Sequence, residues 1–260
     1  MTKENYNPLQ LREIFHLEFL RWLGKKIKPS YYALKGGANL RFFYNSFRYS
    51  EDVDLNARII RVDVLRDKVM QILKSASFQN NLKPFGIDKI IPPNIVKAKQ
   101  TLTTQRFKVH LITPEGEDFF TKIDFSRRKF ENNVKTETVS NTILREYKLA
   151  PLLVPHYDII SAILQKLNAL AFRTTTQARD AFDLYILSTQ FKPADNKKKI
   201  KLNPEIISKA YENIFKISFA QFRDTVISYL LEEDQEIYNS PRSWDEVKLK
   251  TANLIKELRK

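Results

Sequence analysis

The first regular pattern in the chain is a run of apolar residues at helical spacing between residues 9 and 26. Asn7 and Pro8 come immediately before it, and a polar cap followed by a first-turn proline is a common start of an α-helix. Residues three and four apart lie on one side of a helix, and here that side is apolar: Leu11, Ile14, Phe15, Phe19, Leu20 and Leu23. We therefore expect an amphipathic helix over residues 9–26.

Short strands and helices alternate in the next part of the chain. Residues 31–34 and 53–60 have the pattern of strands, and residues 38–44 and 63–75 have that of helices. The second of these helices is expected to bury Val64, Leu65, Val69, Ile72 and Leu73. Residues 106–113 and 119–126 again resemble strands, and the Pro-Glu-Gly-Glu-Asp segment between them is typical of a turn. These two strands are expected to form an antiparallel pair.

The pattern becomes purely helical after residue 157. Helices are predicted over residues 159–172, 177–190, 204–215, 219–232 and 244–258, with a lysine-rich linker at residues 192–202. The sequence thus predicts an α+β protein. An α+β domain built on a mixed sheet with helices would occupy residues 1–150, and a helical domain would occupy residues 151–260.

Composition limits the chemistry that is available. The chain has no cysteine and only three histidines, which excludes disulfides and thiolate sites and disfavours a zinc site. Carboxylates and hydroxyls must therefore carry any catalysis. No apolar run approaches the length of a membrane span, and the first residues lack the apolar core of a signal peptide. We expect a cytoplasmic protein without a membrane partner.

The chain is strongly basic, with a formal net charge of +14. Such a charge attracts polyanions, so nucleic acid is the leading candidate for a partner. A lysine-rich solvated surface explains the charge almost equally well. Lysines cluster at Lys197, Lys198 and Lys199, with Lys192 and Lys201 nearby, and a second basic group consists of Lys248, Lys250, Lys256, Arg259 and Lys260. If RNA is the partner, these helical-half clusters are the expected docking surface.

Asp52 and Asp54 are the candidate metal ligands. Residues two apart on a strand point to the same face, so the two carboxylates would lie together while Val53 and Leu55 pack into the opposite face. Carboxylate oxygens suit Mg²⁺, which can neutralise the phosphates of a nucleoside triphosphate and align an attacking hydroxyl. An Asp-x-Asp pair alone is most often an exposed loop or a strand end.

Gly36 and Gly37 precede this pair. Without a β-carbon, they allow the backbone to approach phosphate closely, and the following helix offers free N–H groups to an anion. A double glycine alone is most often only a turn. The order of strand, double glycine, short helix and Asp-x-Asp is what favours a functional site.

The motifs Leu-Lys-Gly-Gly-x-x-Leu-Arg, at residues 34–41, and Arg-x-Ser-x-Asp-x-Asp-Leu, at residues 48–55, resemble those of the AbiEii-type nucleotidyltransferase toxins, to which the MenT toxins are related. The resemblance implies a Mg²⁺-dependent enzyme with an NTP as substrate and a cognate antitoxin as partner. It implies that residues 1–150 form a nucleotidyltransferase-like domain and that the helical domain at residues 151–260 completes the active site. It also implies that Gly36, Gly37 and Arg41 help to bind the nucleotide.

A second block extends the resemblance. It contains Lys166, then Arg173, then an Asp-x-x-Asp-Leu motif formed by Asp180 and Asp183. The resemblance implies that Lys166, Asp180 and Asp183 belong to the catalytic site and that Lys166 and Arg173 bind the nucleotide. Lys166 and Arg173 lie two helical turns apart and share a face. The alternatives are a solvated lysine and a simple ion pair between Arg179 and Asp183.

Two further residues are candidates with open alternatives. Asp124 lies within an alternating strand and could join the metal site, although a pairing with Lys122 or Arg127 is about equally compatible with the sequence. Ser50 could touch phosphate or cap a turn. The resemblance implies a serine that a kinase-like antitoxin phosphorylates, and the added negative charge would repel a triphosphate.

Three functions remain in competition. The first is a toxin that transfers a nucleotide from an NTP to an RNA end, with tRNA as the expected RNA. The second is nucleotidyl transfer to a small molecule, for which the charge of +14 has no evident use. The third is a non-catalytic nucleic-acid binding protein, which would leave the glycine and aspartate motifs without a role.

Overall fold

The computed structural model describes residues 6–96, 98–127, 133–191 and 203–259. The chain forms two compact units. The first contains Met1–Phe42 and Tyr49–Tyr157, and the second contains Phe43–Arg48 and Asp158–Lys260. A short segment from the N-terminal part of the sequence therefore packs with the C-terminal helices. The division into domains at residue 150 remains a prediction, and the lysine linker at residues 192–202 lies outside the described residues.

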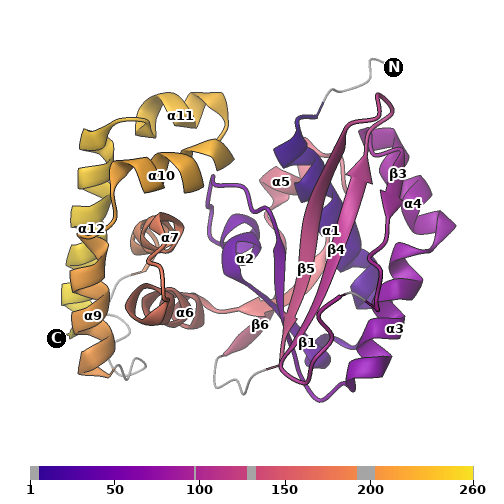
Figure 1. Cartoon of the computed structure of the whole chain (residues 1–260), viewed down its shortest axis with the longest axis horizontal. Coiled ribbons are helices and arrows are strands. Elements are labelled where there is room, and N and C mark those ends of the chain that lie inside the picture. The colour runs from indigo at the N-terminus through magenta and orange to yellow at the C-terminus, as the bar shows by residue number, and fades with distance from the viewer. Residues whose placement is uncertain (1–5, 97, 128–132, 192–202, 260) are drawn as a thin grey trace. The chain divides into compact units, whose positions relative to one another are not determined.

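The first unit is built on a mixed seven-stranded sheet with strand order β3-β4-β5-β2-β1-β7-β6 (Figure 1). In that order the strands are Lys89–Ile91, Thr104–Ile112, Asp118–Ser126, Val53–Ala57, Tyr32–Lys35, Leu153–Tyr157 and Val134–Thr138. β2 pairs in parallel with β5, and β1 pairs in parallel with β7. The other neighbours are antiparallel, including the predicted β4–β5 pair. The predicted mixed α+β fold is confirmed.

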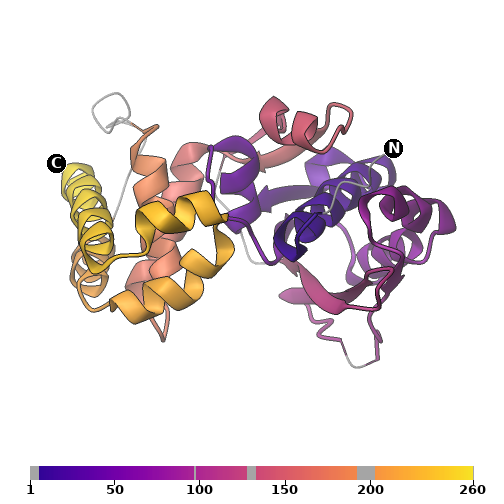
Figure 2. The ribbon, with the colours of Figure 1, turned by 90° about the horizontal axis from the view of Figure 1, so that it is seen from above.

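Three helices bury one face of this sheet. α1 (Pro8–Lys26) begins with a capping box in which Asn7 and Gln10 satisfy each other's backbone N–H groups. It packs beside α3 (Val62–Leu73) and α4 (Ala76–Leu82), as Figure 2 also shows. Phe15 and Trp22 of α1 both meet the ring of Phe78 of α4 edge-on. The side chains that alternate inward on β2, β4 and β5 complete this core, and Val53, Leu55, Phe107, Ile123 and Phe125 are fully buried.

Smaller elements complete the first unit. α2 (Gly36–Phe43) follows β1 directly, and α5 (Asn141–Glu146) lies between β6 and β7 in the sequence. Two short 3-10 turns, η1 (Pro29–Tyr31) and η2 (Lys83–Phe85), join the larger elements. The backbone N–H of Ser140 donates to the carbonyl oxygen of Phe42, which ties the end of α2 to the segment before α5.

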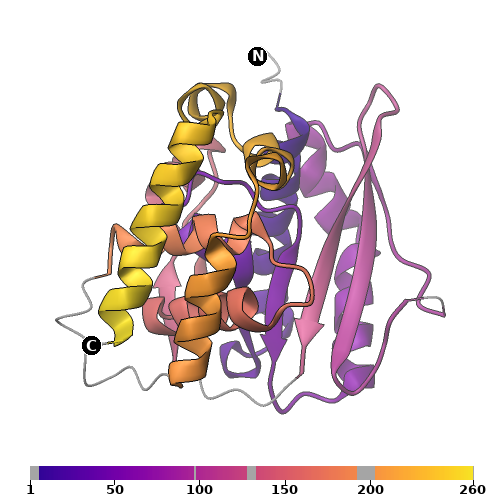
Figure 3. The same ribbon diagram turned by 60° about the vertical axis from the view of Figure 1, so that its left-hand side comes forward.

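The second unit is helical. It contains α6 (Ile159–Phe172), α7 (Ala178–Ser188), α9 (Pro204–Ile214), α10 (Phe219–Thr225), η4 (Ile227–Tyr229), α11 (Glu232–Tyr238) and α12 (Pro241–Arg259). α12 packs against α7 and α9, and Figure 3 shows α9 and α12 side by side. Phe222 and Trp244 stack in the core with their ring centroids 4.4 Å apart. Phe47, from the segment contributed by the N-terminal part of the chain, meets Phe182 edge-on and stacks on Tyr238.

Several details differ from the prediction. The helix expected over residues 219–232 ends at Thr225, and a new helix, α11, begins at Glu232. The first turn of α11 holds three acidic residues, which are favourable at a helix N-terminus and unfavourable at a C-terminus. Val64 was expected to be buried, but it is 39% exposed on α3. None of the helices among the described residues is long and apolar enough to cross a membrane.

Candidate active site

A row of charged side chains crosses the central strands of the sheet. Asp54 of β2 lies opposite Lys35 of β1 on one side and Asp124 of β5 on the other. Asp124 in turn lies opposite Arg106 of β4. Side chains in register on neighbouring strands project from the same face, here the face opposite the buried core. Two carboxylates are therefore neighbours at the centre of the row, with a cation on each flank.

Gly36 makes room for the Asp54 carboxylate. Its φ of +70° is a backbone conformation that residues other than glycine rarely adopt, and a β-carbon there would lie 2.6 Å from Asp54 Oδ2. The close approach of this backbone in the structure is to Asp54, and its approach to phosphate remains a prediction. Gly37 is half-buried in the first turn of α2.

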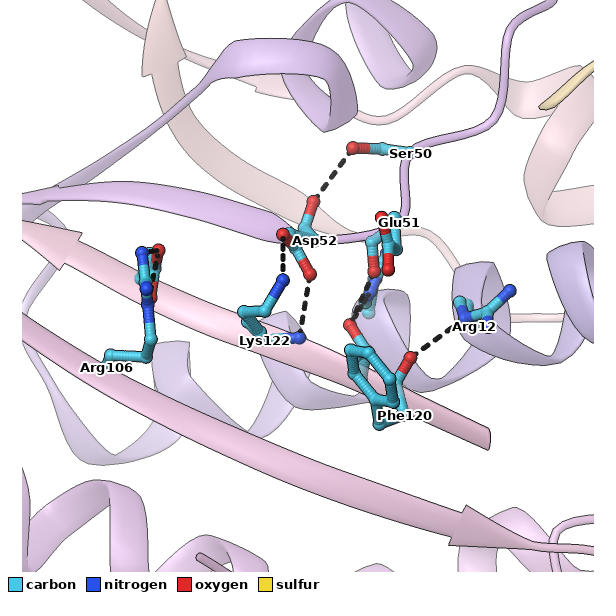
Figure 4. A network of polar contacts seen from close by, with 10 residues as sticks. Arg12, Ser50, Glu51, Asp52, Arg106, Phe120 and Lys122 are labelled. Carbon is cyan, nitrogen blue, oxygen red and sulfur yellow. Dashed lines mark hydrogen bonds and ion pairs between the residues drawn. The ribbon is translucent and has the colours of Figure 1, made fainter. Parts of the chain in front are cut away.

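Asp52 lies directly before β2 and is held by Lys122. Its Oδ1 accepts a hydrogen bond from the Lys122 backbone N–H (3.0 Å), and its Oδ2 contacts Lys122 Nζ (3.3 Å), as Figure 4 shows. Lys122 and Asp124 are two residues apart on β5, so Asp52 and Asp54 project from the same face. Burial raises the pKa of Asp52 above its ordinary value, and the Lys122 charge only partly offsets this effect.

The turn that carries Asp52 is fixed by two short hydrogen bonds. Ser50 Oγ donates to the Asp52 carbonyl oxygen (2.8 Å; Figure 4), which matches the turn-capping alternative for this serine. Thr121 Oγ1 donates to the Glu51 carbonyl oxygen (2.8 Å) and lies 2.7 Å from His16 Nε2. Because the hydroxyl proton of Thr121 is used by Glu51, His16 is the donor in the second contact. Burial, together with the charge of Arg12, lowers the pKa of His16 to about 3, so the ring is neutral.

Asp124 is paired with Arg106. The guanidinium donates to both carboxylate oxygens, with distances of 2.6–3.0 Å. Neither Lys122 nor Arg127, the partners that the sequence suggested, takes this role: Lys122 binds Asp52, and Arg127 donates to Gln105. Within the described ranges, no group of three or more His, Cys, Asp or Glu is placed to hold a metal ion together.

Arg41 points into a buried polar network. Its guanidinium forms an ion pair with Glu13 of α1 (2.7 Å) and lies 4.2 Å from the centroid of the Tyr49 ring. The hydroxyl of Tyr147 donates to the second oxygen of Glu13 (2.7 Å). Burial opposes the charge of Arg41, but the Glu13 carboxylate outweighs it and raises the pKa of Arg41. The contact of Arg41 with the nucleotide remains a prediction.

The second unit holds a separate cluster of buried charges. Lys166 Nζ lies 3.2 Å from Asp180 Oδ1 and 2.6 Å from Asp183 Oδ2. Arg173 Nη2 lies 3.1 Å from Asp180 Oδ2, although the contact does not meet hydrogen-bond geometry. The side chains of Lys166, Asp180 and Asp183 are at most 8% exposed, whereas Arg173 is 38% exposed. The alternative of a solvated Lys166 is therefore wrong.

Arg48 is the cluster member that the sequence singled out least. It donates to both oxygens of Asp183, with Nη2 at 3.0 and 3.2 Å. Arg179, the other candidate partner of Asp183, is exposed. Burial would raise the pKa of Asp183, but the charges of Arg48 and Lys166 lower it. Burial would likewise lower the pKa of Lys166, but Asp183 and Asp180 raise it. Asp183 and Lys166 thus both keep their charge at neutral pH.

The predicted basic surface is described only in part. Residues 192–202, with the three consecutive lysines, lie outside the described residues, as does Lys260. On α12, Lys248 pairs with Asp245 (2.7 Å), and Lys250 and Lys256 lie over the rings of Tyr185 and Tyr211. RNA docking on this helix remains a prediction.

Comparisons with solved structures identify the fold. The chain is 21% identical to JHP933 from Helicobacter pylori, with a TM-score of 0.60 and coverage of 98% of this chain and 95% of that one. A putative nucleotidyltransferase from H. pylori is 20% identical, with a TM-score of 0.55 and 98% of both chains covered. MenT4, a nucleotidyltransferase toxin (Rv2826c) from Mycobacterium tuberculosis H37Rv, is 14% identical, with a TM-score of 0.62 and coverage of 96% and 83%. No curated protein matches the chain.

The family follows from the sequence profile rather than from these distant structures. The profile described as "Nucleotidyl transferase AbiEii toxin, Type IV TA system" matches residues 19–245, which include both predicted motif blocks and most of the chain. Its members are nucleotidyltransferases that act as toxins, so an NTP substrate and a cognate antitoxin are implied. The chain therefore belongs to the AbiEii family of nucleotidyltransferase toxins of type IV toxin–antitoxin systems.

Proposed function

We propose that this enzyme transfers a nucleotide from an NTP to the end of an RNA, with tRNA as the acceptor, and that Asp52 and Asp54 hold the Mg²⁺ ion that the reaction requires. The observation that carries the proposal is that both carboxylates project from one face of the sheet, and that Gly36, which has no β-carbon, leaves room for the Asp54 carboxylate. The net charge of +14 supports an RNA acceptor.

The donor groups fit Mg²⁺. Asp52 and Asp54 offer hard oxygen ligands and are only half-buried. Mg²⁺ is commonly bound through one or two carboxylates together with substrate phosphates, so a pair of aspartates is sufficient without a third protein ligand. When bound, the ion neutralises phosphate charge and aligns the attacking hydroxyl. Asp124, also predicted as a ligand, already accepts hydrogen bonds from Arg106 through both of its carboxylate oxygens.

The residues around the pair hold the carboxylates in position. Lys122 binds Asp52 through its backbone and its side chain, and the Gly36 backbone limits where Asp54 can turn. The Ser50 hydroxyl supports the same turn and lies two residues from Asp52. Phosphate on Ser50 would add nearly two negative charges beside the ligands, which would repel the triphosphate.

The cations of the second unit are proposed to bind the triphosphate. Of these cations, Arg173 is partly exposed. It pairs with Asp180, which also pairs with Lys166. Lys166 already forms ion pairs with Asp180 and Asp183, so its contact with phosphate is proposed to depend on how strongly these two carboxylates hold its ammonium group. That the helical domain completes the active site stays a proposal.

The test incubates the purified protein with each labelled NTP, Mg²⁺ and total tRNA, and measures label in RNA. Wild type is expected to label RNA, and Asp52→Asn and Asp54→Asn are expected to lose this activity. Asp67→Asn, an exposed aspartate on α3 whose side chain is 59% exposed, is the matched control and should retain it. Undiminished labelling by both site variants would refute the metal assignment, and label found only in a small molecule would refute the RNA acceptor.

A further inference from the structure

A basic groove runs along the exposed face of β4. One wall is formed by the side chains of Lys99, Arg106, Lys108 and His110, and the other by Ile91, the last residue of β3, and by the segment after it, including Pro92. Its volume is about 560 Å³, and none of the described residues that line it is acidic. We call this feature the β4 groove. It combines cations with apolar and ring surfaces, which are the two elements that bind single-stranded nucleic acid.

Backbone hydrogen bonds hold both walls of the β4 groove. The N–H of Arg106 donates to the Lys99 carbonyl oxygen (2.8 Å), and the N–H of Thr101 donates to the Thr104 carbonyl oxygen (2.8 Å). On the other wall, β3 pairs antiparallel with β4, and Ile91 lies opposite His110. The cations are therefore carried on paired backbone with defined spacing rather than on an unsupported loop.

Two of the groove cations are not paired with any acidic residue that the structure describes. Arg106 is bound to Asp124, and His110 lies 2.9 Å from Asp118. Lys99 and Lys108, by contrast, form no ion pair with any residue in the described ranges. Lys108 Nζ instead lies 3.9 Å from the centroid of the Phe120 ring on the adjacent strand. Both lysines are exposed, and each can donate to a phosphate without breaking a salt bridge to another described residue.

The β4 groove starts next to the candidate metal ligands. Arg106 contributes to its wall and also binds Asp124, which is the register neighbour of Asp54. Lys108 follows Arg106 by two residues, or roughly 7 Å along the strand, on the same face. An extended chain lying in the groove would therefore have one end close to the carboxylates.

We propose that the β4 groove binds the single-stranded segment of RNA that leads to the end being extended. Lys99 and Lys108 contact its phosphates. Beside the groove, on β5, the ring of Phe120 has its centroid 6.2 Å from that of His110, and the two rings offer a surface on which a base stacks. This inference rests on the proposed RNA acceptor, and it assigns docking to the sheet unit rather than to the lysines of the helical unit.

The test measures binding of a short fluorescent single-stranded RNA against salt concentration, with no NTP present. A variant carrying both Lys99→Glu and Lys108→Glu is expected to bind about tenfold or more weakly, and its logarithmic salt slope should be shallower by about 1.4, or about 0.7 for each lost contact. The matched control carries Lys74→Glu and Lys83→Glu, which are exposed near the helices that cover the opposite face, and should bind as wild type.

Phe120→Leu provides a second, independent measurement. Stacking does not release counterions, so this variant should bind about fivefold or more weakly with an unchanged salt slope. The same proteins are then tested for binding of a fluorescent NTP analogue with Mg²⁺, which the groove variants should retain.

Three results would overturn the inference: RNA binding of the double-lysine variant equal to that of the control, loss of NTP binding in its place, or loss only of binding to the antitoxin protein. The last two would assign the groove to the triphosphate or to an acidic protein surface. Failure of the proposed function looks different, because the protein would then bind RNA through the groove and yet transfer no label to it.

Discussion

The contact between Gly36 and Asp54 allows a direct test of the proposed metal site. In Gly36→Ala, the new β-carbon would lie 2.6 Å from Asp54 Oδ2, whereas ordinary contact begins at 3.4 Å. The carboxylate must therefore retreat by roughly 0.8 Å, and displacements of about 1 Å in a catalytic arrangement can cost about 10²-fold in rate. The positive φ adds about 1–2 kcal/mol of strain to the folded state.

Gly116 in the β4–β5 turn separates these two effects. It also has a positive φ, +87°, but a β-carbon there would meet nothing within 4 Å. Gly116→Ala should therefore lose a similar 1–2 kcal/mol of stability, seen as a lower midpoint in urea unfolding, and keep its activity.

The assay compares kcat/KM for nucleotide transfer in the two variants at a temperature where both are folded. Gly36→Ala is expected to fall by about 10²-fold and Gly116→Ala to stay at the wild-type value. Equal kcat/KM in the two variants would mean that the position of Asp54 does not matter for the reaction, and the assignment of Asp54 as a metal ligand would lose its support.

The remaining predictions concern buried polar groups. Lys166→Met removes the cation shared by two carboxylates that are at most 1% exposed, so the free energy of unfolding measured in urea should fall by about 3 kcal/mol or more. The control is Lys209→Met, whose pair with Glu205 is about half exposed, and its free energy of unfolding should fall by no more than about 0.5 kcal/mol. Equal losses would contradict the burial argument. The folded-state pKa of His16, about 3, lies below the ordinary value of 6.5, so the unfolded state binds the proton first and stability should fall as pH drops from about 6.5 towards 3. His16→Gln should flatten that part of the stability profile, and an unchanged profile would show that His16 does not cause it.

Some features of this protein follow from the sequence because they depend on local periodicity. The alternation around Val53 and Leu55 was enough to predict that both are buried and that Asp52 and Asp54 share the other face. The helix over residues 159–172 was predicted with its observed bounds, because its apolar spacing and its flanking residues agree. The two motif blocks, which contain the family's residue types in order, likewise identified the family without a structure.

Other features were decided only by tertiary structure. Short strands such as β3, β6 and β7 were not predicted, because a strand of a few residues is stabilised by its neighbours in the sheet rather than by its own composition. The sequence also could not show that segment 43–48 packs with the helical unit or that Arg48 binds Asp183, since these residues are 135 positions apart.

The sequence did not determine which residues the charged side chains pair with. Asp124 was a candidate metal ligand with two possible partners nearby in the sequence, yet the register of β4 against β5 gives it Arg106. Lys166 could have been a solvated helix residue, and its burial between Asp180 and Asp183 results from the packing of α6 against α7. A charge selects its partner by distance and desolvation, and both quantities are set by how elements distant in the sequence pack together.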